Sequence, residues 1–258
     1  MYIKRLAAAA AIVLAAVGGV QAKDWSKVRI GSEGAYPPFN SLTADGQLVG
    51  FDIDIANALC EEMKVECEFV TQDWDGMIPA LQAGKFDAVI ASMSITEERK
   101  LKVDFTNKYY NTPPAIAVPK DSKLTGTTDA DLKGVMLGAQ SSTTHSNYAE
   151  EKLPSADLKL YPTPDEYKLD VANGRIDAVI DDVVVLSDWL KSDDGACCKL
   201  LGTLTPDPVI NGQGAGIAIR KEDGDLKEMF NKAIAAILAN GKYKEINDKY
   251  FEFDVYGG

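Results

Sequence analysis

The chain has 258 residues, a formal net charge of −12 at pH 7 and 46% hydrophobic residues. This length is enough for one large domain or two small ones with sizeable cores. So acidic a chain is a poor partner for nucleic acid or an anionic membrane surface, because like charges repel. His145 is the only histidine beside four cysteines. We therefore expect neither a metal site nor another cofactor.

The first 22 residues have the pattern of a cleaved secretory signal. Lys4 and Arg5 precede an almost unbroken apolar run over 6–20, and Val20–Ala22 places small residues where a signal peptidase reads. The alternative is a retained anchor, but a run of about 15 residues is short of the roughly 20 that span a bilayer. We predict that 1–22 is a signal peptide and that the mature chain is exported to the periplasm without a membrane span or lipid anchor.

The cysteines form two close pairs. Cys60 and Cys67 flank a predicted turn between a helix and a strand, and in an oxidising compartment we expect a disulfide that stabilises the fold by roughly 2.5 kcal/mol. The alternative is two buried thiols. Cys197 and Cys198 are adjacent, so their α-carbons lie about 3.8 Å apart and a bridge between them would be strained. Free thiols and an intermolecular contact both remain open for that pair.

A ten-residue pattern occurs twice in the chain. Leu81–Ile90 reads LQAGKFDAVI, and Val171–Ile180 reads VANGRIDAVI. Each copy predicts a helix end, a glycine cap and a short buried strand. Coincidence is the alternative, because such junctions are common, but ten aligned positions favour an internal repeat. Val28–Gly31 and Val135–Gly138 are the matching first strands.

Apolar residues at helical spacing lie between these strands. The predicted helices cover 52–63, 75–84, 143–152, 165–173 and most of 225–250. Strands that alternate with helices predict α/β lobes whose parallel sheets are covered on both faces. Two such lobes in one exported chain indicate a ligand cleft between them.

Ligands of open parallel sheets bind beyond the carboxyl ends of the strands. The repeated strands are followed by Ala91–Arg99 and by Asp181–Asp182, and the first strands by Ser32–Tyr36 and Ala139–Thr144. These segments are polar and carry both charge signs, which suits a zwitterion.

Three motifs in order resemble the polar amino acid family of bacterial periplasmic solute-binding proteins, in particular the branch for lysine, arginine, ornithine and histidine. They are Glu33–Phe39 (EGAYPPF), Gly50–Ala56 (GFDIDIA) and Ser92–Arg99 (SMSITEER). The similarity covers essentially all of 27–256, including the closing segment Lys249–Tyr256. It implies capture of a cationic L-amino acid by hinge closure and delivery to an inner-membrane ABC permease, by a protein that we expect to be a monomer.

The resemblance also implies two Rossmann-like α/β lobes joined by a two-strand hinge, the periplasmic binding protein type II arrangement. We place lobe I at 23–111 and 213–258 and lobe II at 112–212. The linking strands are expected near Pro113–Val118 and Gly212–Ile219.

The resemblance assigns the two charged ends of the ligand. Arg99 would clamp the α-carboxylate, because a guanidinium donates two parallel bonds to it, with help from Ser94 and the helix-start N–H groups near Thr143. Asp182 would accept the α-ammonium group, with help from Ser92. The alternatives are ordinary: a solvated helix charge for the arginine, helix caps for Ser94 and Thr143, and a strand-end acid for the aspartate. Adjacent Asp181 leaves that last choice open on spacing alone.

Other positions would hold the ligand side chain. Tyr36 and Trp74 match two stacking aromatics, and Glu33 matches the acid that faces the distal cationic group. Core packing for the aromatics and a surface position for the glutamate are the alternatives. The remaining positions of the predicted ligand set are Ala91, Ala139 and Ser142.

Some residues depart from the family pattern. Ala91 stands where relatives often carry serine, Ser141 replaces a usual glycine, and Thr144 replaces a frequent glutamine. Relatives that bind opines also share the Glu33–Tyr36 (EGAY) start of the first motif and the tryptophan at position 74. Octopine, nopaline or an uncharged polar amino acid is therefore the alternative ligand.

Two further predictions concern catalysis and the single histidine. Some relatives of the fold are dehydratases, but no Ser–His or Cys–His pair is evident, and we do not expect an enzyme. His145 is read as a loop or helix-start residue near the site without a partner.

Overall fold

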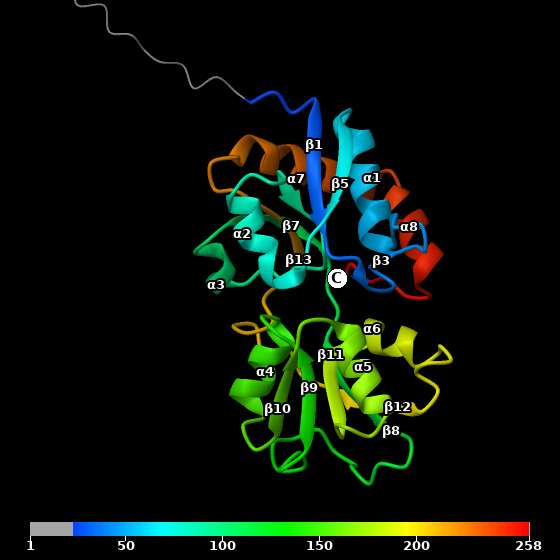
Figure 1. The fold of residues 1–258 in the computed structure, drawn as a ribbon. Coiled ribbons are helices and arrows are strands. Elements are labelled where there is room, and N and C mark those ends of the chain that lie inside the picture. The colour runs from blue at the N-terminus through cyan, green and yellow to red at the C-terminus, as the bar shows by residue number, and fades with distance from the viewer. Residues whose placement is uncertain (1–22, 258) are drawn as a thin grey trace, which may run out of the picture.

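The computed structural model describes residues 23–257, so the predicted signal peptide lies outside the described residues. Two α/β lobes, each built on a five-stranded sheet, lie one above the other in Figure 1. The chain passes between them twice, after residue 110 and again after residue 203. No helix among the described residues has the length and apolar character to span a bilayer.

Lobe I contains the N-terminal and C-terminal parts of the described chain. In spatial order its main sheet consists of β5 (Glu66–Thr71), β1 (Lys27–Ser32), β6 (Ala88–Val89), β13 (Ala215–Ile219) and β7 (Asp104–Tyr110). A small sheet is formed by β2 (Ala35–Tyr36), β3 (Asn40–Leu42) and β4 (Leu48–Val49). The helices are α1 (Phe51–Met63), η1 (Trp74–Gly76), α2 (Met77–Gln82), α3 (Glu97–Lys100), α7 (Gly224–Ala239) and α8 (Lys242–Tyr250).

Lobe II repeats the arrangement with the middle of the chain. Its sheet has the order β10 (Asp157–Tyr161), β9 (Met136–Gln140), β11 (Ala178–Asp182), β8 (Pro114–Pro119) and β12 (Cys198–Thr203). Its helices are α4 (Thr144–Lys152), α5 (Pro164–Ala172) and α6 (Val183–Trp189). The two-lobed α/β fold expected from the sequence is confirmed.

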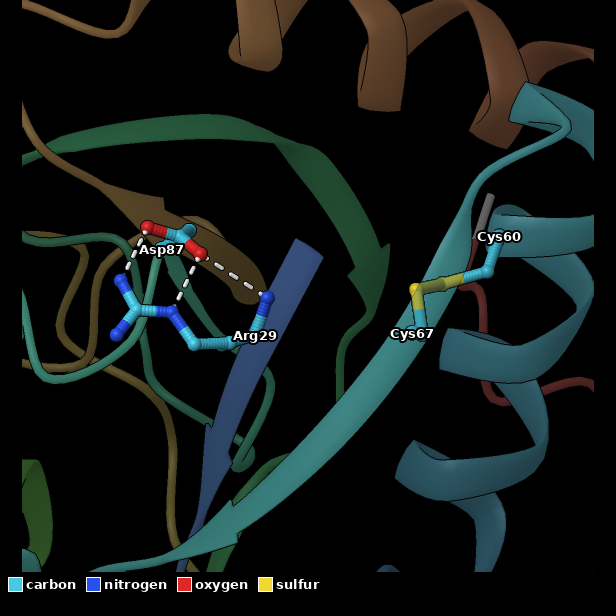
Figure 2. The surroundings of a disulfide bond; sticks show 4 residues. All are labelled: Arg29, Cys60, Cys67 and Asp87. Atoms are coloured by element: carbon cyan, nitrogen blue, oxygen red, sulfur yellow. Dashed lines mark hydrogen bonds and ion pairs between the residues drawn. A yellow bond between two sulfur atoms is a disulfide. The ribbon is translucent and has the colours of Figure 1, made fainter. Parts of the chain in front are cut away.

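The ten-residue repeat occupies equivalent places in the two sheets. Strands β6 and β11 are each third in their sheet, where β6 is parallel to β1 and β11 is parallel to β9. The repeated aspartate has the same role in both: Asp87 accepts a hydrogen bond from the backbone N–H of Arg29 at 3.0 Å, and Asp177 accepts one from Met136 at 2.9 Å. Figure 2 shows Asp87 and Arg29 facing one another beside β1. The repeat therefore reflects one structural unit built twice.

Both sheets are covered on both faces, as predicted. The two residues of β6 and the two that follow it alternate between two hydrophobic clusters, with Ala88 and Ile90 in one and Val89 and Ala91 in the other. Alternation of this kind is what a strand with period-two side chains requires when both faces are buried.

The prediction of parallel sheets is wrong for one strand of each lobe. Strand β13 runs antiparallel to β6 and β7, and β8 runs antiparallel to β11 and β12. These are the expected linking strands. The chain enters each sheet there directly from the other lobe, without the crossover helix that parallel pairing needs.

The start of helix α1 requires a glycine at position 50. Gly50 has φ 124°, and a Cβ atom there would lie 2.4 Å from the backbone oxygen of Phe39. Only glycine tolerates this combination. The buried face of the helix includes Ile55 and Leu59, four residues apart, and Asp52 in the first turn is also buried. The Gly50–Ala56 motif thus sets the entry of α1 and places one carboxylate inside lobe I.

The predicted disulfide is present. Cys60 of α1 and Cys67 of β5 are bonded with their α-carbons 6.2 Å apart, and Figure 2 shows the bridge between helix and strand. Cys197 is exposed and Cys198 is buried, and both are free thiols. Among residues 23–257, no group of three or more His, Cys, Asp or Glu side chains is arranged to hold a metal ion.

Candidate ligand-binding cleft

A small cavity of about 30 Å³ lies between the lobes and is lined by residues from both. Its predicted lining residues are Glu33, Tyr36, Trp74, Ala91, Ser92, Ser94, Arg99 and Thr143. It is also lined by Gln140, Thr144 and His145, which were not predicted as ligand contacts.

The cleft is closed by hydrogen bonds that cross between the lobes. The Tyr36 hydroxyl donates to Asp181 Oδ1 at 2.5 Å, and Gln140 Nε2 donates to Glu33 Oε1 at 2.6 Å. At the outer side, Trp74 Nε1 donates to the backbone oxygen of Ser142 at 3.1 Å. Direct bonds of this length hold the two strand-end surfaces together, so the structure represents the closed arrangement of the lobes.

Arg99 brings a guanidinium to the outer end of the cavity. Helix α3 starts at Thr96, whose hydroxyl accepts from the Arg99 N–H at 3.2 Å. Arg99 Nη1 donates to the Ser94 backbone oxygen at 3.0 Å, Nη2 donates to that of Ser142 at 3.2 Å, and the group lies 5.3 Å from the Trp74 ring centroid. Removal from water lowers the pKa of Arg99 to about 10, which leaves it charged at neutral pH. Of its five N–H donors only two are used, so it can still bind a carboxylate.

The start of α4 lies beside this guanidinium. Thr143 and Ser146 form a reciprocal capping box in which the Thr143 N–H donates to Ser146 Oγ at 3.2 Å. The amide of Thr143 is therefore occupied. The next two N–H groups, those of Thr144 and His145, belong to the unpaired first turn of the helix, where an anion is favoured. Ser94 Oγ lies 3.4 Å from Thr144 Oγ1 across the cleft.

Glu33 brings a carboxylate into the same cavity. Its side chain accepts from Gln140, the residue is 8% exposed, and burial raises its pKa to about 7. Within the described range 23–257, no Lys, Arg or His forms an ion pair with it. A buried carboxylate without a cation is unfavourable, so the cavity is suited to a ligand that supplies one.

The two adjacent aspartates at the end of β11 face different surroundings. Asp182 begins α6: its Oδ1 accepts from the Val184 N–H at 2.7 Å, and its Oδ2 accepts from the Thr112 hydroxyl. Burial raises the pKa of Asp182 to about 7. It lines a second cavity on the hinge side, which shares Tyr36 and Ser92 with the first. Asp182 is thus both a helix cap and a cleft residue.

Asp181 does not line either cavity but joins the lobes. It accepts hydrogen bonds from the hydroxyls of Tyr36 in lobe I and Tyr167 in lobe II. The spacing of the sequence left the roles of the two aspartates open, and the structure separates them by the direction of each side chain.

The three remaining predicted positions differ in their relation to the cavity. Ser142 has φ 58° and turns its backbone oxygen toward both Trp74 and Arg99. Ala91 lines the main cavity. Ala139 is fully buried in the core of lobe II and is not among the residues that line either cavity.

His145 is a helix-start residue, as expected, but it also has a partner that the sequence did not indicate. His145 occupies the first turn of α4, and its Nδ1 lies 3.2 Å from Asp181 Oδ1. Burial lowers the pKa of this imidazole, which keeps it neutral at pH 7. It lines both cavities. Gln140 is the last residue of β9, and His145 follows in the first turn of α4, so both belong to the strand-end segment that the sequence singled out.

The sequence pattern that defines the bacterial extracellular solute-binding proteins, family 3, matches residues 28–253. The chain belongs to this family. It is 51% identical over 233 residues to the L-arginine-binding protein of Pseudomonas aeruginosa, covering 89% of this chain and 90% of that protein. It is 41% identical over 228 residues to ABC transporter arginine-binding protein 1 of Escherichia coli, covering 87% and 90%.

A solved structure shows the same architecture. An ancestral arginine-binding protein bound to arginine superimposes with a TM-score of 0.80 at 37% identity, covering 88% of this chain and 98% of that one. These family members are binding proteins rather than enzymes, which supports the prediction that the chain is not an enzyme.

Proposed function

We propose that this chain is the periplasmic binding component of an amino acid ABC transporter and that it captures a cationic L-amino acid in the closed cleft. Arginine is the leading ligand, with ornithine, lysine and histidine as the other members of the class. The observation that carries the proposal is one cavity lined by Arg99 and by buried Glu33. Neither forms an ion pair within residues 23–257, so a ligand with a carboxylate and a distal cation satisfies both.

The ligand has a natural orientation in this cavity. Its α-carboxylate meets Arg99 and the free N–H groups at the start of α4, and its α-ammonium group meets Ser92 and Asp182. The side chain then passes between Tyr36 and Trp74 toward Glu33. A cation against an aromatic face contributes about 0.5–2 kcal/mol.

Closure follows from the same contacts. Lobe I, residues 23–111 and 213–258, supplies Arg99 and Glu33, whereas lobe II, residues 112–212, supplies α4 and Asp182. A ligand that bonds to both lobes favours the closed state over the open one by its additional contacts. The permease of the transporter then receives the closed, loaded form.

Relatives support the class of ligand and the role in transport. The proteins from Pseudomonas aeruginosa and Escherichia coli are arginine-binding, and the second is named as part of an ABC transporter. A cleaved signal at 1–22 would deliver the chain to the periplasm, where its Cys60–Cys67 bridge is stable.

An opine is the second candidate. The hinge-side cavity adjoins Asp182, which leaves room beside the α-ammonium position for a substituent on that nitrogen. Titration calorimetry of the mature chain with L-arginine, L-ornithine, L-lysine, L-histidine, octopine and L-glutamine tests the proposal. We expect arginine, ornithine or lysine to bind more tightly than glutamine. Preference for glutamine would overturn the cationic class, and preference for octopine would replace it with the second candidate.

A further inference from the structure

A buried carboxylate lies directly behind the cleft without lining it. Asp52, in the first turn of α1, is fully buried. It accepts three hydrogen bonds: from Asn40 Nδ2 at 2.8 Å, from Ser92 Oγ at 2.9 Å and from the Tyr109 hydroxyl at 2.8 Å. The Gly50–Ala56 motif therefore supplies a polar centre that the ligand contacts proposed above do not use.

The direction of each hydrogen bond around Asp52 is determined by chemistry. The Asn40 nitrogen can only donate. The Tyr109 oxygen accepts from the backbone N–H of Ser92 at 3.0 Å, and its own hydrogen is directed to Asp52 Oδ1. The single hydroxyl hydrogen of Ser92 is directed to Asp52 Oδ2. Both donors of Ser92 are therefore committed to this buried cluster.

This arrangement decides what Ser92 presents to a ligand. Ser92 lines both cavities and has φ 56°, and its N–H is held by Tyr109. With its hydrogen turned away, the Ser92 hydroxyl has only lone pairs left for the cleft. A free serine hydroxyl can turn to donate or accept, whereas this one can only accept.

We infer that Asp52 is a positioning residue for ligand selection, which fixes the Ser92 hydroxyl as a hydrogen-bond acceptor and so makes the site select an α-ammonium group. The inference rests on the proposed function and extends it to a residue that never touches the ligand. Burial raises the pKa of Asp52 to about 6, which leaves the carboxylate ionised and acceptor-only at neutral pH.

The test compares L-arginine with 5-guanidinopentanoic acid, which is arginine without its α-amino group. The ratio of their dissociation constants measures selection for the ammonium group alone. Asp52→Leu has the same branched shape but no acceptor, so the Ser92 hydroxyl is free to turn. We expect this ratio to fall by up to about tenfold, because a Ser92 hydroxyl that is free to turn can still accept from the ammonium group but is no longer held in that orientation.

Three further variants separate positioning from a structural role. In Asp52→Asn the amide oxygen can take the Oδ2 position and still accept from Ser92, so the ratio should stay within about threefold of wild type. Ser92→Ala removes the acceptor itself and should lower the ratio at least as much as Asp52→Leu does, and the double variant should lower it no further than Ser92→Ala alone. Asp54→Leu, two residues along α1 with partners Lys249 and Tyr250, is the matched control and should leave the ratio unchanged.

A purely structural role of Asp52 predicts that Asp52→Leu weakens both ligands equally, and that result would overturn the inference. If Asp52→Leu does not fold, a neutron structure of the wild-type protein decides directly. Deuterium on the Asp52 side of Ser92 Oγ supports the inference, and deuterium on the cavity side overturns it. That measurement needs no ligand, so it also separates this inference from the proposed function: wild-type protein that does not bind L-arginine refutes only the latter.

Discussion

Tyr36 of lobe I and Asp181 of lobe II are joined by a hydrogen bond of 2.5 Å between the tyrosine hydroxyl and Asp181 Oδ1. The same carboxylate accepts from Tyr167 of its own lobe and lies 3.2 Å from His145 Nδ1. Asp181 is therefore fixed within lobe II, and Tyr36 is its partner across the cleft. We expect closure of the proposed hinge to depend on this contact as well as on the ligand.

Loss of the Tyr36 hydroxyl should shift the protein toward the open state. Tyr36→Phe keeps the ring but removes a hydrogen bond to a charged group, so we expect weaker ligand binding by up to about tenfold and a larger radius of gyration without ligand. Calorimetry and small-angle X-ray scattering measure the two effects. Tyr161→Phe is the control, because the Tyr161 hydroxyl bonds to Asp170 within lobe II. Equal behaviour of the two variants would contradict the role of Tyr36 in closure.

Removal of the Glu33 charge should weaken the selectivity for a cationic ligand and raise the stability of the ligand-free protein. Glu33→Gln should weaken L-arginine at least tenfold relative to L-glutamine, because the distal cation loses its carboxylate. Its pKa is raised to about 7 by burial, so in the ligand-free protein the charged form is disfavoured. The unfolded chain releases this proton at lower pH, and the free energy of unfolding therefore falls as pH rises toward 7.

In Glu33→Gln the free energy of unfolding does not fall in this way, because position 33 carries no titratable group. This variant should therefore melt at a higher temperature than wild type at pH 8 when no ligand is present. Differential scanning calorimetry at pH 5 and pH 8 measures the difference. A melting temperature below that of wild type at pH 8, or an unchanged ranking of ligands, would remove the role of Glu33 as an unpaired acid.

Ligand affinity should depend on pH in the same region. Glu33 and Asp182 both have pKa values raised to about 7 by burial, and both must be ionised to meet a cation. We expect the affinity for L-arginine to fall as pH decreases from 8 to 5.5, because binding must then release protons. Calorimetry in buffers of different ionisation enthalpy counts these protons. In Glu33→Gln the fall should be shallower, and an affinity independent of pH would contradict the assignment of both carboxylates.

Reduction of the Cys60–Cys67 bridge should destabilise lobe I without changing the cleft. The bridge joins α1 to β5, away from the cavity residues, and its loss should lower the free energy of unfolding by roughly 2.5 kcal/mol. Denaturation of the Cys60→Ser/Cys67→Ser variant measures the loss, and Cys197→Ser serves as control. A strong effect of the double variant on arginine affinity would show that the bridge also supports the site.

Much of this architecture was predictable from the sequence, because the repeat places Asp87 and Asp177 at the same structural junction in both lobes. The helix boundaries also agree with the apolar spacing within a few residues. The direction of β8 and β13 was not predictable from local patterns, since it depends on how the chain passes between lobes. Mixed pairing of this kind is a property of topology rather than of propensity.

The candidate site was likewise predictable only in part. Motifs indicated Arg99 and Glu33, whose residue types already suggest their chemistry. Gln140 and His145 act through partners on other segments, at positions 33 and 181, and no local pattern reports such a pairing. The separate roles of Asp181 and Asp182 likewise depend on side-chain direction, which is set by the start of α6.

The central claim is that one amino acid is held by both lobes at its charged ends. A crystal structure of the mature protein with L-arginine tests it most directly. We expect the α-carboxylate to bond to Arg99, the α-ammonium group to Asp182 and Ser92, and the guanidinium to lie against Glu33. Arginine bound in the opposite direction, or held by one lobe alone with Arg99 and Asp182 free, would contradict the account.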